Sequence, residues 1–158
     1  MPLNKNDKAI DFTLKHKTPE GLKDVKLTDY LGEKRIVLLF FPLAFTGGCT
    51  NEMCTISNDL SEYDKLDAQV LAISVDSPFA QEAWVKENDI TIPVLSDFNK
   101  EVCRAYGVCY EEFLGLGLKG VAKRAAFVIN KEQVITYSWV TEDPKNLPNF
   151  DEIKKALL

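Results

Sequence analysis

The sequence predicts an α/β fold in which helices cover both faces of a mixed central sheet. Residues 35–41, RIVLLFF, form a continuous apolar run of strand length, which is typical of a central parallel strand buried on both faces. After this run, strand-like and helix-like segments alternate, as in parallel strands joined by helices. Near the end, residues 125–129 and 134–140 are apolar or alternating runs separated by NKEQ, which predicts a hairpin. That antiparallel hairpin makes the predicted sheet mixed.

The first elements follow from local signals. A small hairpin is expected before residue 35. Pro42 ends the strand over 35–41, because proline has no N–H to give to a sheet. From Cys49 to Leu66, apolar residues recur at spacings of three and four, which predicts one apolar face of a helix.

The later elements are predicted in the same way. Apolar periodicity, together with proline and glycine residues at the ends of segments, predicts these elements in chain order: strand 69–75, helix 79–88, strand 92–95, helix 99–106, the hairpin strands 125–129 and 134–140, and helix 151–158. No repeat or linker divides the chain, and 158 residues are enough to bury a substantial core. We therefore expect a single domain over residues 1–158.

Composition excludes several classes of protein. An apolar fraction of 46% and a charged fraction of 27% are ordinary for a globular protein. The net charge of −5 argues against a nucleic-acid partner, since phosphate binding needs clustered lysine and arginine. The N-terminus is too polar for a signal peptide and no apolar run is long enough to span a membrane, so we expect a cytoplasmic protein without a membrane partner.

Cys49 stands where a reactive thiol would be placed. It follows the carboxyl end of a buried strand and lies in the first turn of the next helix, where open sheets bind ligands. The helix dipole and free N–H groups favour the thiolate there. Gly47 and Gly48 leave room for a small substrate, and Thr46 can bring its hydroxyl beside the sulfur. The alternative from position alone is a cysteine that simply packs under a loop.

The stretch PLAFTGGCTNE adds a family resemblance. Its Pro42, Thr46, Cys49 and Glu52 resemble the Pro-x-x-x-Thr-x-x-Cys-x-x-Glu motif of the peroxiredoxins, cysteine-based peroxidases of thioredoxin-like fold. The likeness continues through SVDSPFAQEAW, PVLSDFNKEVCRAYGV and RAAFVIN. It implies a thioredoxin-like sheet with peroxiredoxin-type insertions, and reduction of hydrogen peroxide or alkyl hydroperoxides without a cofactor or metal.

The resemblance also implies site residues. Cys49 matches the peroxidatic cysteine, and Pro42, Thr46 and Arg124 match its partners. Arg124 would favour the thiolate and hold the peroxide oxygens, while Pro42 would keep water from the sulfur. Glu52 is a carboxylate near a thiolate, which it would oppose unless it orients Arg124. We therefore expect an ion pair between Glu52 and Arg124.

The sequence does not decide which thiol reacts with oxidised Cys49. Cys54 resembles the in-helix resolving cysteine of the PrxQ or bacterioferritin-comigratory-protein branch. Five helical residues, however, separate the two Cα atoms by roughly 8.7 Å, more than the about 7 Å that a disulfide allows, so the helix would have to unwind. FFPLAFTGG is similar to the AhpE branch, which permits an external thiol. Cys103 is expected in the core, Cys109 in a loop that could approach the site, and a bridge between them is a further alternative.

The implied partners are a hydroperoxide substrate and thioredoxin, glutaredoxin or a similar thiol reductant, with a homodimer also possible. A non-enzymatic redox sensor and a thioredoxin-like disulfide oxidoreductase are the alternative functions, and the latter is weakened because no C-x-x-C is present. The absence of paired C-x-x-C motifs also argues against a zinc site. Residues 115–120, GLGLKG, satisfy the letters of a dinucleotide motif but precede a strand rather than follow one, so nicotinamide or flavin cofactors are not expected.

Overall fold

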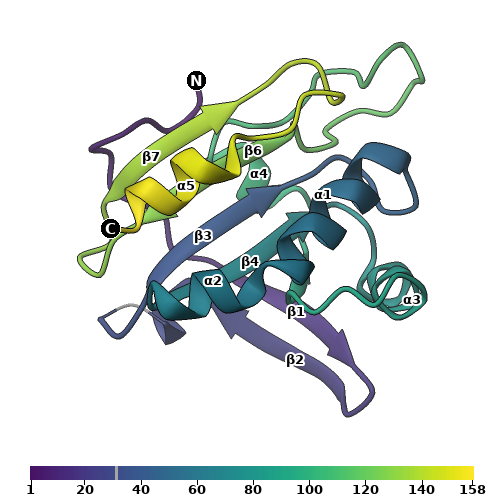
Figure 1. Cartoon of the computed structure of the whole chain (residues 1–158). Coiled ribbons are helices and arrows are strands. Elements are labelled where there is room, and N and C mark those ends of the chain that lie inside the picture. Colours follow the sequence, from purple (N-terminus) through teal and green to yellow (C-terminus); the bar gives the residue numbers. More distant parts are fainter. Residues whose placement is uncertain (31) are drawn as a thin grey trace.

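The computed structural model describes residues 1–30 and 32–158 and contains one seven-stranded sheet (Figure 1). Its order is β2-β1-β5-β4-β3-β6-β7. β3 and β4, and β4 and β5, run parallel, whereas every other neighbouring pair is antiparallel. The predicted mixed sheet is thus confirmed. The strands are β1 (Thr13–Thr18), β2 (Gly21–Lys26), β3 (Arg35–Phe40), β4 (Ala68–Ser74), β5 (Val94–Ser96), β6 (Ala125–Ile129) and β7 (Ile135–Val140).

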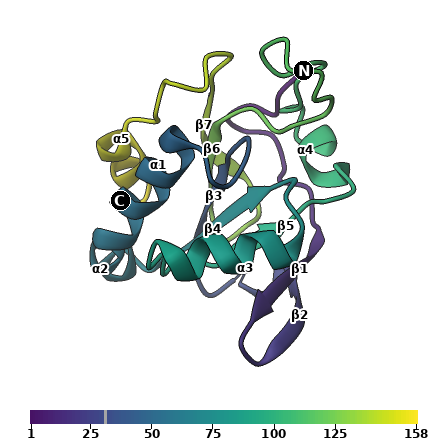
Figure 2. The same ribbon diagram turned by 90° about the vertical axis from the view of Figure 1, so that its right-hand side faces the viewer.

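Helices cover both faces of this sheet, as Figures 1 and 2 show. One face packs on side chains from α1, α2, α3 and α5, and the other packs on α4, the long loop after it and the N-terminal segment. The helices are the 3-10 turn η1 (Leu27–Asp29), α1 (Gly47–Asn58), α2 (Leu60–Lys65), α3 (Pro78–Glu87), α4 (Glu101–Ala105) and α5 (Phe150–Ala156). Within the described residues, no helix has the length and apolar character needed to cross a membrane.

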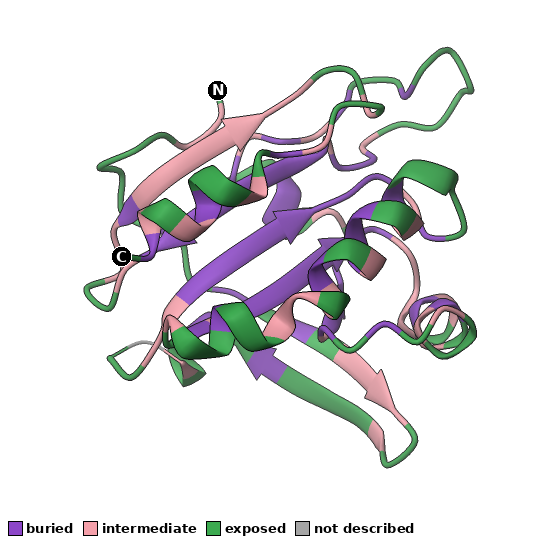
Figure 3. Ribbon diagram, in the orientation of Figure 1, coloured by how far each residue is buried: buried purple, intermediate pink, exposed green. Residues whose placement is uncertain are grey.

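The apolar run of β3 is explained by these two layers. Residues 37, 39 and 41 face the core beneath α1 and α3, whereas residues 36, 38 and 40 face the core beneath α4. Every side chain from Ile36 to Phe41 is fully buried, so no position in the run tolerates a polar residue (Figure 3). The two hairpins predicted at residues 125–140 and before residue 35 are also confirmed.

The helix predicted over 49–66 is in fact two helices. α1 starts at Gly47 and ends at Asn58, and α2 starts after Asp59, whose backbone (φ −109°, ψ 12°) leaves the helical range. Asn58 and Asp59 are weak helix formers, and the Asp59 carboxylate binds Lys154 of α5. Periodicity alone missed the break because the apolar spacing continues across it, from Ile56 of α1 to Tyr63 of α2.

The strand predicted at 92–95 lies slightly later, at Val94–Ser96. Pro93 cannot donate to the sheet, although its carbonyl accepts a hydrogen bond from Ala72 N–H at 3.0 Å. The pairing of β5 with β4 therefore begins at Val94.

The end of α4 depends on Gly107. Gly107 N–H donates to the carbonyl of Arg104 at 3.0 Å, and Val108 N–H donates to that of Cys103 at 2.9 Å. With φ +72° at Gly107, these two bonds form a Schellman motif, which reverses the chain. A Cβ on Gly107 would also lie 2.2 Å from the carbonyl oxygen of Met1. Both backbone conformation and packing therefore require glycine here.

Replacing Gly107 with alanine should destabilise the fold by about 2–4 kcal/mol. About 1–2 kcal/mol comes from the left-handed conformation, and the remainder from displacing the N-terminal segment that the new Cβ would overlap. Gly115→Ala is the matched control, because Gly115 has φ +70° with nothing within 4 Å of its Cβ position. Urea unfolding should show the larger loss for Gly107→Ala; equal losses would contradict the steric part of this argument.

Candidate functional site

Cys49 lies in the first turn of α1, at the end of the loop that leaves β3. Thr46 is the N-cap residue with extended backbone (φ −104°, ψ 150°), and its carbonyl accepts the first helical bond, from Thr50 N–H at 3.0 Å. The amides of residues 47–49 precede that bond and so lack partners within the helix. The Cys49 side chain is buried, while Gly47 and Gly48 in front of it are exposed. The predicted position at a helix N-terminus is confirmed.

Arg124 joins this turn from the start of β6. Its guanidinium donates from Nε to the Pro144 carbonyl at 3.0 Å, from NH1 to Glu52 Oε1 at 2.8 Å, and from NH2 to Cys49 Sγ at 3.2 Å. Arg124 is 1% exposed, so these bonds are shielded from water. A Cβ on Gly48 would lie 3.2 Å from NH2, which explains a small residue beside the sulfur. The predicted pairing of Arg124 with Glu52 is confirmed.

Burial and neighbouring charges shift the pKa values of Glu52 and Arg124. Burial raises the pKa of Glu52 to about 7, against the opposing effect of Arg124. Burial lowers the pKa of Arg124, but the Glu52 carboxylate and Cys49 together raise it above its ordinary value. Glu52 Oε2 is buried without a hydrogen-bond partner among the described residues. The guanidinium thus stays charged, and Glu52 is the member of the pair that titrates near neutral pH.

The pKa of Glu52 predicts how stability depends on pH. Because the folded protein binds this proton more tightly than the unfolded chain does, the free energy of unfolding should fall as pH rises from 4.5 to about 7 and then level off. The decrease should amount to up to about 3 kcal/mol. Urea unfolding across this range should show the decrease in the wild type and not in Glu52→Gln.

The exposed Glu142 gives the control for this experiment. Its carboxylate binds Lys123 at the surface with 77% of the side chain exposed. Glu142→Gln should retain the decrease seen in the wild type. Parallel stability curves for the wild type and Glu52→Gln would show that Glu52 does not cause it.

Pro42 and Thr46 lie on the loop between β3 and α1. Pro42 is buried, and the exposed Thr46 donates its hydroxyl to the Leu43 carbonyl at 2.7 Å. Asp76, just after β4, holds this loop by accepting the Ala44 N–H at 2.8 Å. Because the Thr46 hydroxyl donates its proton to the Leu43 carbonyl, it can act toward a further group only as an acceptor, through its oxygen.

Cys54 lies further along α1, on the side that packs against the core beneath α1 and α3. Its Sγ is 3.8 Å from the Asn88 carbonyl oxygen at the end of α3. Since α1 is continuous from Gly47 to Asn58, Cys49 and Cys54 keep their helical separation. The structure describes all four cysteines, and each is a free thiol.

Three contributors to the site were not predicted. Trp84 is fully buried on α3 and donates its Nε1–H to Thr50 Oγ1 at 3.0 Å. This bond ties the first turn of α1 to α3. Asp76 could have been noticed as a polar residue at the carboxyl end of a buried strand. The Pro144 carbonyl that anchors Arg124 leaves no signal in sequence, because any residue could supply it.

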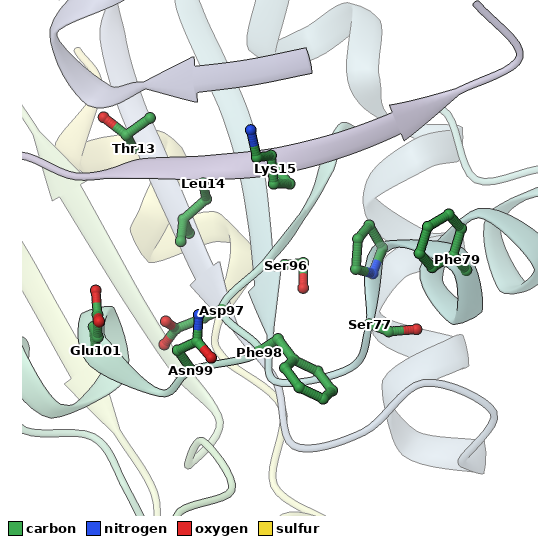
Figure 4. A pocket seen from close by; sticks show the side chains of 11 residues that line it. Thr13, Leu14, Lys15, Ser77, Phe79, Ser96, Asp97, Phe98, Asn99 and Glu101 are labelled. Atoms are coloured by element: carbon green, nitrogen blue, oxygen red, sulfur yellow. The ribbon is translucent and has the colours of Figure 1, made fainter. Parts of the chain in front are cut away.

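Other features of the described chain lie outside this site. A pocket of about 440 Å³ between β1, the start of α3 and the segment after β5 is lined by Phe79 and Phe98, each 61% exposed, and contains neither Cys49 nor Arg124 (Figure 4). Residues 115–120 form a loop closed by a bridge between Phe113 and Leu118. No group of three or more metal-binding side chains occurs within residues 1–30 and 32–158.

Comparison with known proteins identifies relatives of this chain. The AhpC/TSA family matches residues 6–138. The chain is 37% identical to 2-Cys peroxiredoxin BAS1 of the Spinacia oleracea chloroplast over 147 residues, which cover 89% of this chain and 53% of that protein. It is also 37% identical to alkyl hydroperoxide reductase E of Mycobacterium tuberculosis over 138 residues, covering 86% and 84%. The chain thus spans about half the length of the spinach relative and most of the mycobacterial one.

Solved structures of similar fold also come from peroxiredoxins. The crystal structure of peroxidoxin BcpB from Mycobacterium tuberculosis matches with a TM-score of 0.81 and 27% identity, over 98% of this chain and 94% of that one. Mycobacterium tuberculosis AhpC matches with a TM-score of 0.82 at 27% identity, over 99% and 92%. The likeness first indicated by PLAFTGGCTNE therefore extends from a short motif to the whole sheet. By sequence and by structure, this chain belongs to the AhpC/TSA family, the peroxiredoxins, and has their thioredoxin-like fold.

Proposed function

We propose that the chain is a thiol-dependent peroxidase that reduces hydrogen peroxide and alkyl hydroperoxides through Cys49. The contact that carries this proposal is the 3.2 Å hydrogen bond from Arg124 NH2 to Cys49 Sγ, at the amino end of α1. A guanidinium and a helix N-terminus both favour the thiolate, which is the nucleophilic form of cysteine. The exposed glycines beside Cys49 support access for a small substrate.

In the proposed step, the Cys49 thiolate attacks the terminal peroxide oxygen and the O–O bond breaks. The leaving alkoxide or hydroxide takes the bonding electrons and then a proton, and Cys49 becomes a sulfenic acid. Arg124 has five N–H groups, of which three are bonded within the described residues, so two remain for the oxygens that gain charge. Thr46 would accept the hydrogen bond of the hydroperoxide O–H, Pro42 would exclude water, and Glu52 would orient Arg124.

The sulfenic acid is then reduced by a thiol. That thiol attacks the sulfenic sulfur, water leaves, and a disulfide forms that a donor such as thioredoxin or glutaredoxin reduces. Cys54 and an external thiol are the two candidates for this step. The continuous α1 supports the external thiol, because a bridge from Cys49 to Cys54 requires that the part of α1 between them unwind.

One equivalent of hydrogen peroxide should distinguish these candidates. We expect the fully reduced protein to gain about 16 Da at Cys49, trapped by a sulfenic-acid reagent. Peptide mapping by mass spectrometry locates the change, and Cys54→Ser should give the same product. A mass loss of about 2 Da mapped to a bridge between Cys49 and Cys54 would instead assign an internal two-cysteine cycle.

We further propose a cytoplasmic protein of one domain that assembles as a homodimer. Four free thiols support a compartment in which thiols are kept reduced. The single sheet that runs through the chain supports one domain. The exposed Phe79 and Phe98 support a dimer contact at the pocket in Figure 4.

Multiple-turnover peroxide consumption with a dithiol donor tests the proposed activity. The wild-type protein should consume many equivalents of peroxide when thioredoxin or glutaredoxin and their reductases are supplied. Consumption of one equivalent per protein with every donor would instead favour the redox sensor.

A further inference from the structure

Two cysteines that the proposed peroxidase does not use meet outside its site. Cys103 is fully buried on α4, and the half-buried Cys109 follows six residues later. The Cys103 sulfur lies 3.7 Å from the carbonyl oxygen of Gly120, whose N–H donates to the Tyr110 carbonyl next to Cys109, and both cysteines are free thiols. A buried thiol and a half-buried thiol therefore lie near each other, outside the Cys49 site.

The turn at Gly107 brings these thiols together. In its Schellman motif, the Val108 N–H binds the carbonyl of Cys103 itself, so the next residue, Cys109, returns alongside α4. Cys109 is then fixed from the other side by a bridge to Ala122 and by the 2.8 Å bond from Tyr110 N–H to the Val121 carbonyl. The approach of the two sulfurs is therefore built into the folded backbone, whereas Cys49 and Cys54 would need α1 to unwind.

The two thiols differ in access to solvent. Cys109 lines an open groove of about 690 Å³ together with Arg104 and Lys123. The Cys103 sulfur lies inside, 3.6 Å from the Lys100 carbonyl oxygen and 3.7 Å from that of Gly120. The neighbouring Cys103 thiol lowers the pKa of Cys109, helped by Arg104 and Lys100 and opposed by burial and by Asp97. The neighbouring Cys109, with burial, raises the pKa of Cys103. Cys109 is thus the first nucleophile and Cys103 the second.

We propose that Cys103 and Cys109 form a second redox couple, separate from Cys49, that exchanges with small-molecule disulfides. The Cys109 thiolate attacks one sulfur of the disulfide, and one thiolate leaves. Cys103 then attacks the sulfur of Cys109 in the mixed disulfide, its proton passing to the second leaving thiolate. The net change is one protein dithiol oxidised and one small disulfide reduced to two thiols.

Redox titration of the Cys49→Ser/Cys54→Ser variant tests this couple without any peroxidase chemistry. The full chain is equilibrated in buffers of graded glutathione to glutathione disulfide ratio, quenched with acid, alkylated and analysed by mass spectrometry with peptide mapping. We expect the thiols at 103 and 109 to be lost together, with a bridged peptide whose fraction follows the buffer ratio. Two thiols that stay free at every ratio, or a stable glutathione adduct on Cys109, would overturn the proposal.

Single variants give matched controls. Cys103→Ser should accumulate the glutathione adduct at Cys109, because the closing thiol is absent. Cys109→Ser should leave Cys103 unreacted while the protein is folded, because Cys103 is buried. Mapping the same bridge in the wild-type chain guards against a folding defect in the variants. Since the titration uses protein without Cys49, its outcome is independent of whether the chain is a peroxidase.

Discussion

Cys49→Ser is expected to reduce multiple-turnover peroxide consumption by roughly 10³-fold or more. A serine hydroxyl does not ionise at neutral pH, and oxygen cannot cycle through a sulfenic acid, so the hydrogen bond from Arg124 would have no anion to stabilise. The measurement is peroxide loss with a thioredoxin or glutaredoxin donor system in excess.

Cys109→Ser is the matched control for this loss. It also removes one thiol, but at a position outside the Cys49 site, and its peroxide consumption should equal that of the wild type. Circular dichroism should show that both variants are folded. A Cys49→Ser protein that is folded and still turns over at the wild-type rate would refute the proposed peroxidase mechanism.

Arg124→Ala is expected to lower the rate of peroxide reduction by about 10²–10³-fold, as the loss of a fixed donor at developing charge does elsewhere. It should also destabilise the protein, since Glu52 would remain buried with neither oxygen paired. Breaking one side of a buried ion pair costs about 3–5 kcal/mol, and less where the carboxyl can take up a proton. Stopped-flow rates and urea unfolding measure the two effects separately.

The double variant Arg124→Ala/Glu52→Gln separates these effects. It should recover part of the lost stability, because no buried carboxylate remains, but none of the lost rate. Lys123→Ala, one residue away, removes a surface ion pair with Glu142 and should leave the rate unchanged. Recovery of the rate in the double variant would show that Arg124 acts only by neutralising Glu52.

Local chemistry determined which parts of this molecule could be predicted from sequence. The run over 35–41 predicts a buried central strand because sheet burial needs apolar residues at every position. The pairing of Glu52 with Arg124 was predictable because a carboxylate near a thiolate needs a cation. The break at Asp59 was missed because the apolar residues of α1 and α2 pack on the same core and keep helical spacing across it.

Backbone groups account for most of what sequence could not provide. The Pro144 carbonyl positions Arg124, yet a carbonyl belongs to every residue. Cys103 and Cys109 lie near each other because the chain reverses at Gly107. A spacing of six residues in the sequence does not by itself predict that reversal. Cys54 resembles the branch in which α1 must unwind to form an internal disulfide, whereas FFPLAFTGG resembles the branch in which an external thiol reacts and α1 stays helical. The oxidised protein distinguishes these two cycles.

The bond from Trp84 to Thr50 gives the protein an optical reporter of its own. The indole is fully buried, packs against the tilted ring of Phe41 with centroids 5.1 Å apart, and is hydrogen-bonded to the residue directly after Cys49. Any event that opens the first turn of α1 must break this bond and change the surroundings of the indole. Trp139 lies on β7, outside that turn. Tryptophan fluorescence can therefore follow the opening of this helix in unlabelled protein, on the timescale of oxidation itself.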